Sequence, residues 1–159
     1  MQPEPAQLLI HRFAPGTRLE GGVLGALERM DLSGDRRLLD ALFVARDAES
    51  GNLEAVDLAT GRASGSVVAM LDFRLDPARR RAVTERTLAG HPGGVPPAVV
   101  RAIGARLEPG GAILAVLVAG GQPTDLADAV HRAGGRLLVD VRVDAVTLAA
   151  LGAQLLAAP

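Results

Sequence analysis

An apolar run from Ala112 to Ala119 constrains the fold of this chain more than any other feature. It lies within LEPGGAILAVLVAGG, residues 107 to 121, between two Gly-Gly pairs. A membrane helix needs about 20 apolar residues, so this run is too short to cross a bilayer. A phosphate-binding loop places its glycines just before a helix, whereas here they flank apolar residues. Because the run lacks polar alternation, it predicts a central strand that is covered on both faces.

Other segments carry the patterns of further strands and helices. Apolar segments bounded by turn residues predict strands at Gln7–Phe13, Leu38–Asp47, Leu53–Ala59 and Arg136–Val143. Caps and helical spacing predict helices that follow Thr17, Pro77, Pro97, Thr124 and Asp144, and Gly134 ends the helix that starts at Thr124. The segment GSVVAMLDFRL fits either a strand or a short helix.

The order of these elements predicts two similar units around an insert. We expect one domain over residues 1–159, with strand–helix–strand–strand at 1–60, a helical insert at 61–109, and strand–helix–strand plus a C-terminal helix at 110–159. Right-handed crossovers allow two such units to interleave in one sheet. The predicted fold is therefore α+β: a ferredoxin-like antiparallel sheet of about five strands with helices on one face. The other face needs a cover, either the insert or a second subunit.

Composition argues against several classes of function. The net charge of −1 and an aromatic content of 2% do not suit nucleic-acid binding, which depends on basic charge and stacking. No cysteine is present, so disulfides, thiolate nucleophiles and zinc-ribbon sites are excluded. The segment MQPEPAQLLIHRF lacks the basic and long apolar regions of a signal peptide, so we expect a cytoplasmic location without membrane insertion.

Three stretches together resemble a bacterial domain family of unknown function from GC-rich genomes, with ferredoxin-like halves. They are FAPGTRLEGGVLGALERM, LLDALFVARDAESGNLEAVDL and LEPGGAILAVLVAGGQPTDLADAVHRAGGRLLVDVRV. The D-x-L-F-V-x-(K/R)-D strand of the family is matched by Asp40–Asp47. The family is distantly similar to another of unknown function that carries a glycine zipper. This chain has DPARRRAVTER and GHPGGVPP in that place, so a membrane role is not implied.

No group of residues forms a complete catalytic, cofactor-binding or metal-binding motif. The histidines, His11, His91 and His131, lack the paired ligands of a metal site. We therefore predict no catalytic residue, no cofactor and no metal ligand. His11, Asp40 and Arg46 are candidate liners of a ligand pocket, although Asp40 is interpreted as the exposed start of its strand.

These observations leave two hypotheses of function. The sequence favours a non-enzymatic interaction or self-assembly module, which forms a homo-oligomer or binds a protein partner through its sheet or its insert. The alternative is a small-ligand-binding protein or enzyme whose pocket lies between the sheet and the insert. Association with a membrane surface is the weakest interpretation.

Overall fold

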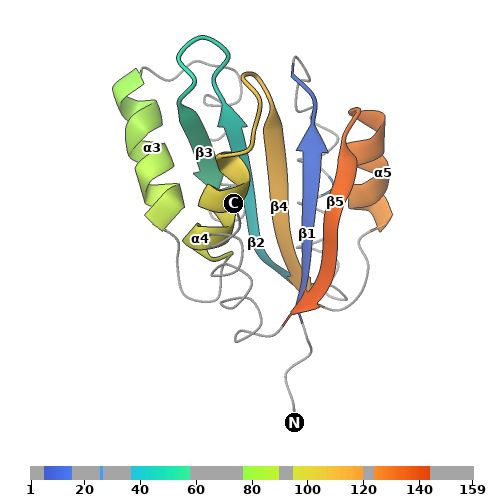
Figure 1. Ribbon diagram of the computed structural model, residues 1–159. Coiled ribbons are helices and arrows are strands. Elements are labelled where there is room, and N and C mark those ends of the chain that lie inside the picture. Colours follow the sequence, from blue (N-terminus) through green and yellow to red (C-terminus); the bar gives the residue numbers. More distant parts are fainter. Residues whose placement is uncertain are drawn as a thin grey trace.

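The computed structural model describes residues 6–15, 26, 37–57, 77–89, 95–119 and 124–143. In these ranges, five strands form one antiparallel sheet in the order β3-β2-β4-β1-β5 (Figure 1). The strands are β1 (Ala6–Phe13), β2 (Arg37–Arg46), β3 (Leu53–Asp57), β4 (Ala112–Ala119) and β5 (Arg136–Val143). The helices are α3 (Pro77–Ala89), α4 (Pro97–Gly104) and α5 (Thr124–Arg132). Ala26 is also helical.

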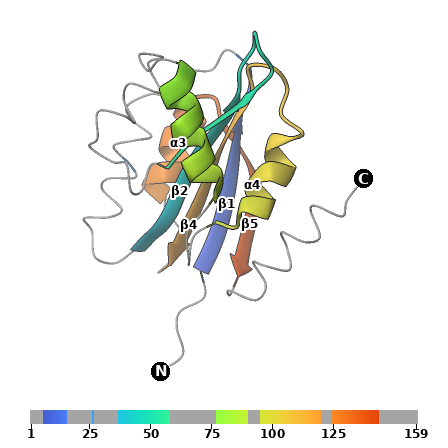
Figure 2. The same ribbon diagram turned by 90° about the vertical axis from the view of Figure 1, so that its left-hand side faces the viewer.

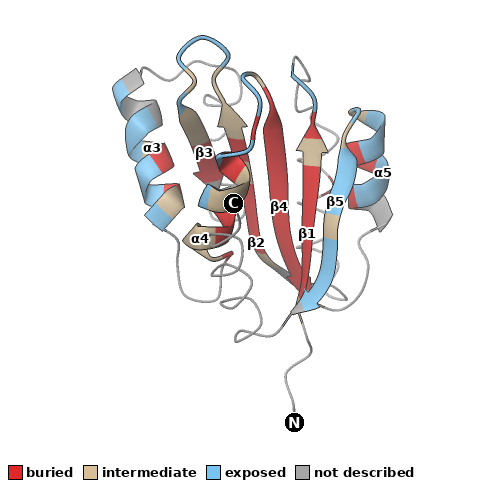
Figure 3. Ribbon diagram, viewed as in Figure 1, coloured by how far each residue is buried: buried red, intermediate tan, exposed pale blue. Residues whose placement is uncertain are grey.

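The apolar run that predicts a central strand forms β4. It pairs with β2 on one side and with β1 on the other. Every residue from Ala112 to Val118 is buried, and Figure 3 shows β4 and most of β1 in the colour of buried residues. The predicted strand with both faces covered is therefore confirmed.

The strands of the two sequence units interleave. β4 lies between β1 and β2, and β1 lies between β4 and β5. Each unit thus places a strand of the other between its own two strands, which is the ferredoxin-like arrangement. β3 extends this four-stranded core at the β2 side (Figure 1).

Different helices cover the two faces of the sheet. On the side that we call the α5 face, Ala26 and the α5 residues Leu126 and Val130 pack against the strands. On the side that we call the α4 face, Val99 and Val100 of α4 pack against the strands. Figure 2 shows α4, in yellow, and α5, in orange, on opposite sides of the sheet. The sequence leaves open whether the insert or a second subunit covers the second face of the sheet. In the structure, α4 of the insert covers it.

The α3 helix covers the β3 edge of the sheet. It lies beside β3 (Figure 1), and the Thr84 hydroxyl accepts a hydrogen bond from the Ala55 amide at 3.0 Å. An edge strand exposes unpaired backbone groups, so a helix that bonds to one of them blocks addition of another strand.

Local signals locate most element boundaries correctly. α3 and α4 begin at the prolines that predict them, because proline has no N–H to lose in the first turn. The α5 helix ends as predicted at Gly134, which has a φ of 86° and donates to the His131 carbonyl at 3.0 Å. The predicted first and C-terminal helices lie outside the described residues, except for Ala26, and so does the segment GSVVAMLDFRL.

Candidate functional site

Asp40 lies in β2 and is buried, with 1% of its surface exposed. One carboxylate oxygen accepts from the Ala41 amide at 2.9 Å, and the other accepts from the Val95 amide at 2.8 Å. Val95 lies just before α4, so Asp40 ties the start of this helix to the sheet. The interpretation of Asp40 as an exposed strand start is wrong, because the backbone before α4 packs over it.

Arg46, at the other end of β2, holds the opposite end of α4. Its guanidinium donates to the carbonyls of Leu107 at 2.9 Å and Gly104 at 3.0 Å. It also donates to the carbonyl of Gly51, in the turn between β2 and β3. A guanidinium presents several donors in one plane, which suits it to join carbonyls from separate segments. Arg46 thus connects the end of α4 to the β2–β3 hairpin.

His11 lies on the α5 face, because it alternates along β1 with Leu9 and Phe13, which pack on that side. It is 3% exposed, and neither ring nitrogen has a hydrogen-bond partner. Burial lowers the pKa of His11 from 6.5 to about 4, although the negative charge of Asp140 acts in the opposite direction. The imidazole is therefore neutral at pH 7.

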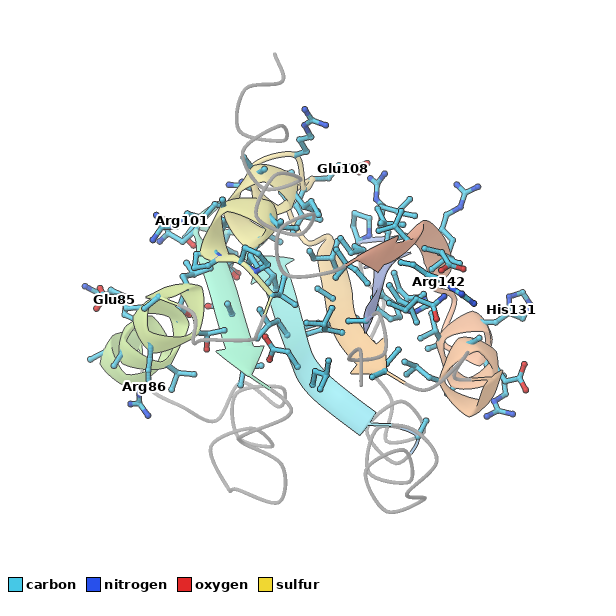
Figure 4. The ribbon with its side chains drawn as sticks, turned by 90° about the horizontal axis from the view of Figure 1, so that it is seen from below. Glu85, Arg86, Arg101, Glu108, His131 and Arg142 are labelled. Carbon is cyan, nitrogen blue, oxygen red and sulfur yellow. The ribbon has the colours of Figure 1, made fainter. Side chains whose placement is uncertain are left out.

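The three candidate pocket residues do not meet in one site. Asp40 and Arg46 bond to the two ends of α4, whereas His11 lies on the opposite face of the sheet. No group of three metal-ligating side chains occurs in the part of the chain that the structure describes. His131 is exposed and projects from α5 (Figure 4), and His91 lies outside the described ranges.

The β5 strand is the most exposed strand of the sheet. Among the described residues it pairs with β1 alone, and Figure 3 shows most of it in the colour of exposed residues. Leu137 and Leu138 are each 50% exposed, and Val141 is 38% exposed. The strand is predicted from the sequence, but its exposure is not. Two adjacent leucines and several charged residues in RLLVDVRV are the features of the sequence that could have indicated an exposed strand.

An irregularity divides β5 into two parts. Ile10 pairs with Val139 and His11 pairs with Leu137, so Leu138 is an extra residue in β5. Such a bulge reverses the alternation of side chains along the strand. The segment Val139–Val143 beyond it pairs regularly with Ala6–Ile10.

This regular segment separates charged and apolar side chains. Asp140 and Arg142 pair with Leu9 and Gln7, so both lie on the α5 face. The Gln7 amide donates a hydrogen bond to the Asp140 carboxylate. Arg142 is exposed (Figure 4). Val139 packs with the core of the α4 face, and Val141, two residues along the strand, lies on the same side.

Comparison with known proteins gives no relative: no protein-family model, curated protein or solved structure matches this chain. Among the described residues, no helix is both long enough and apolar enough to span a membrane.

Proposed function

We propose that this chain is a non-enzymatic protein-interaction module that adds a strand from a partner to the β5 edge. The observation that carries this proposal is the contrast between the two edges of the sheet. The α3 helix bonds to the backbone of β3 through Thr84, whereas β5 exposes Leu137, Leu138 and Val141.

Strand addition uses groups that an edge strand already presents. Unpaired N–H and C=O groups of the edge bond to the incoming backbone, and alternate side chains provide specificity. The half-exposed leucines add apolar area that would leave water on docking. Asp40 and Arg46 are polar residues that could have suggested a catalytic site. They bond to backbone groups around α4, which supports the non-enzymatic part of the proposal.

The test is to place charge on this edge. We would replace Leu138 and Val141 together by lysine, because lysine on an edge strand opposes pairing with another strand. Leu138 is 50% exposed and Val141 is 38% exposed, so the fold should persist. The matched control is Ala78→Lys with Ala82→Lys on α3, where both alanines are exposed and the added charge is the same.

The readouts are molar mass by light scattering over a range of concentrations and recovery of defined partners in pull-downs. We expect association by the wild type and the α3 control, and its loss in the Leu138→Lys/Val141→Lys protein. Two outcomes would overturn the proposal. One is a wild type that stays monomeric and recovers no partner, and the other is association that persists with lysines on β5.

A further inference from the structure

We infer that the partner on the β5 edge is a second copy of this chain, paired antiparallel through Val139–Val143 about a two-fold axis at Val141. This inference rests on the proposed function of the β5 edge. It follows from the residues of the regular segment, VDVRV, which complements itself when the direction of the strand is reversed.

The register follows from the order of charges. A two-fold axis at Val141 places Asp140 of each copy opposite Arg142 of the other. Residues directly opposite in an antiparallel pair share one face, and Asp140 and Arg142 both lie on the α5 face. Opposite charges in such positions stabilise a strand pair. The remaining positions of the register place valine opposite valine.

Neighbouring registers lack this match. An axis at Asp140 or at Arg142 places that charge opposite itself. An axis at Val139 pairs Asp140 with Leu138 and Arg142 with Arg136 in sequence, so it joins no opposite charges. Like charges directly opposite one another destabilise a strand pair.

An axis at Leu138 fails for a different reason. It pairs Arg136 with Asp140 in sequence, but the bulge separates them in space. Arg136 pairs with Arg12 and Asp140 pairs with Leu9. Since Leu9 and Arg12 are three positions apart in β1, their side chains lie on opposite faces of the sheet. Among the residues of β5, Arg136–Val143, the axis at Val141 is therefore the one that joins opposite charges on the same face.

Such a dimer is expected to be weak and dependent on concentration, because a short strand edge buries little area. Its self-association should be measured by sedimentation up to about 1 mM, where complexes with millimolar dissociation constants are populated.

The experiment exchanges the two charges. Asp140→Arg alone and Arg142→Asp alone each place like charges opposite one another, so each should weaken the dimer at least tenfold. An equimolar mixture of the two proteins pairs arginine with aspartate at both positions, so it should form a heterodimer. The double variant Asp140→Arg/Arg142→Asp should again form a homodimer.

Matched controls make the same changes of charge elsewhere. Glu85→Arg and Arg86→Asp alter two exposed residues that project from α3 (Figure 4), and they should leave the dimer unchanged. Asp140 also accepts a bond from Gln7, so circular dichroism must show that Asp140→Arg folds. Asp140→Asn keeps an acceptor for Gln7 and removes the charge, and it should weaken the dimer to a smaller extent.

The outcomes separate this inference from the proposed function. Weak self-association of each single variant, together with a heterodimer in their mixture, would support both the inference and the proposed function. A monomeric wild type that binds another protein through β5 would overturn the second copy as partner but keep the proposed function. A dimer insensitive to the charge exchanges would overturn the register. A wild type without any association that depends on β5 would overturn both.

Discussion

On the α4 face, polar side chains tie the sheet to its cover, whereas the α5 face meets its helix through close apolar contacts. Asp40 and Arg46 bond to backbone groups at the two ends of α4. On the α5 face, a Cβ added at Gly135 would come within 2.5 Å of Val130 and 2.8 Å of Phe13. The glycine therefore allows the chain to turn from α5 into β5 against the core.

The difference reflects how each helix is connected. The segments that flank α4 carry backbone groups without ladder partners, and buried backbone groups need partners. Asp40 and Arg46 supply them for Val95, Gly104 and Leu107. By contrast, the α5 end satisfies its own backbone, since the Gly135 amide donates to the Val130 carbonyl at 2.9 Å. Polar residues in a strand can thus be structural even where they resemble a site.

The largest effect is expected from Asp40→Ala on the α4 face. It removes the acceptor for two backbone amides, of which Val95 is the long-range partner. Hydrogen bonds to a charged acceptor contribute about 1.5–3 kcal/mol each, so the loss of both should lower the free energy of unfolding by about 3–6 kcal/mol. Urea denaturation measures this loss. Asp40→Asn keeps one acceptor and should lose about half as much. A loss below about 1 kcal/mol for Asp40→Ala would show that these bonds do not hold the insert.

A smaller loss is expected from Gly135→Ala on the α5 face. The new methyl group would overlap Val130 and Phe13, and overpacking of a core costs about 1–3 kcal/mol. Val130→Ala on the same protein should relieve part of this strain, so the double variant should be more stable than the sum of the two losses predicts. Thermal or urea unfolding of all four proteins closes the cycle. Strictly additive losses would mean that overlap with the Val130 side chain does not cause the loss of stability in Gly135→Ala.

The elements that are encoded locally could be predicted from the sequence. The unbroken apolar run of β4 and the prolines at the starts of α3 and α4 act within a few residues, so their patterns are visible in the chain. The two interleaved units followed from the order of these elements. Exposure of the β5 edge depends on which strands end the sheet, and the alternation in RLLVDVRV does not reveal this order.

The roles of the candidate residues could not be predicted, because their partners are distant in sequence. Asp40 and Val95 are 55 positions apart, and Arg46 and Gly104 are 58 apart. A carboxylate and a guanidinium in an apolar strand are visible in DALFVARD, but the pattern does not distinguish a pocket from a bond to an insert. His11, the third candidate, is buried without a hydrogen-bond partner on the opposite face of the sheet, and its place in the sequence of β1 does not reveal this burial.

The smallest effect on stability at pH 7 is expected from His11→Leu, which would make the α5 face more uniformly apolar. Leucine has a similar volume and no buried polar atoms, so we expect the stability at pH 7 to rise by about 1 kcal/mol. The pH dependence should change as well. The folded pKa of about 4 lies below the unfolded value of 6.5, so the wild type is stable above pH 6.5 and loses stability as the pH falls from 6.5 to 4.

This loss should amount to about 3 kcal/mol in the wild type, since each pKa unit corresponds to about 1.4 kcal/mol. The His11→Leu protein should lack this part of the acid sensitivity. Urea midpoints between pH 7 and pH 4 measure it, and His131→Leu on the exposed surface of α5 is the matched control. If both variants lost stability as steeply as the wild type, the acid sensitivity would arise from other groups. If the urea midpoint became independent of pH in His11→Leu alone, the acid sensitivity would arise from the imidazole of His11, which the α5 face then accommodates only in its neutral form.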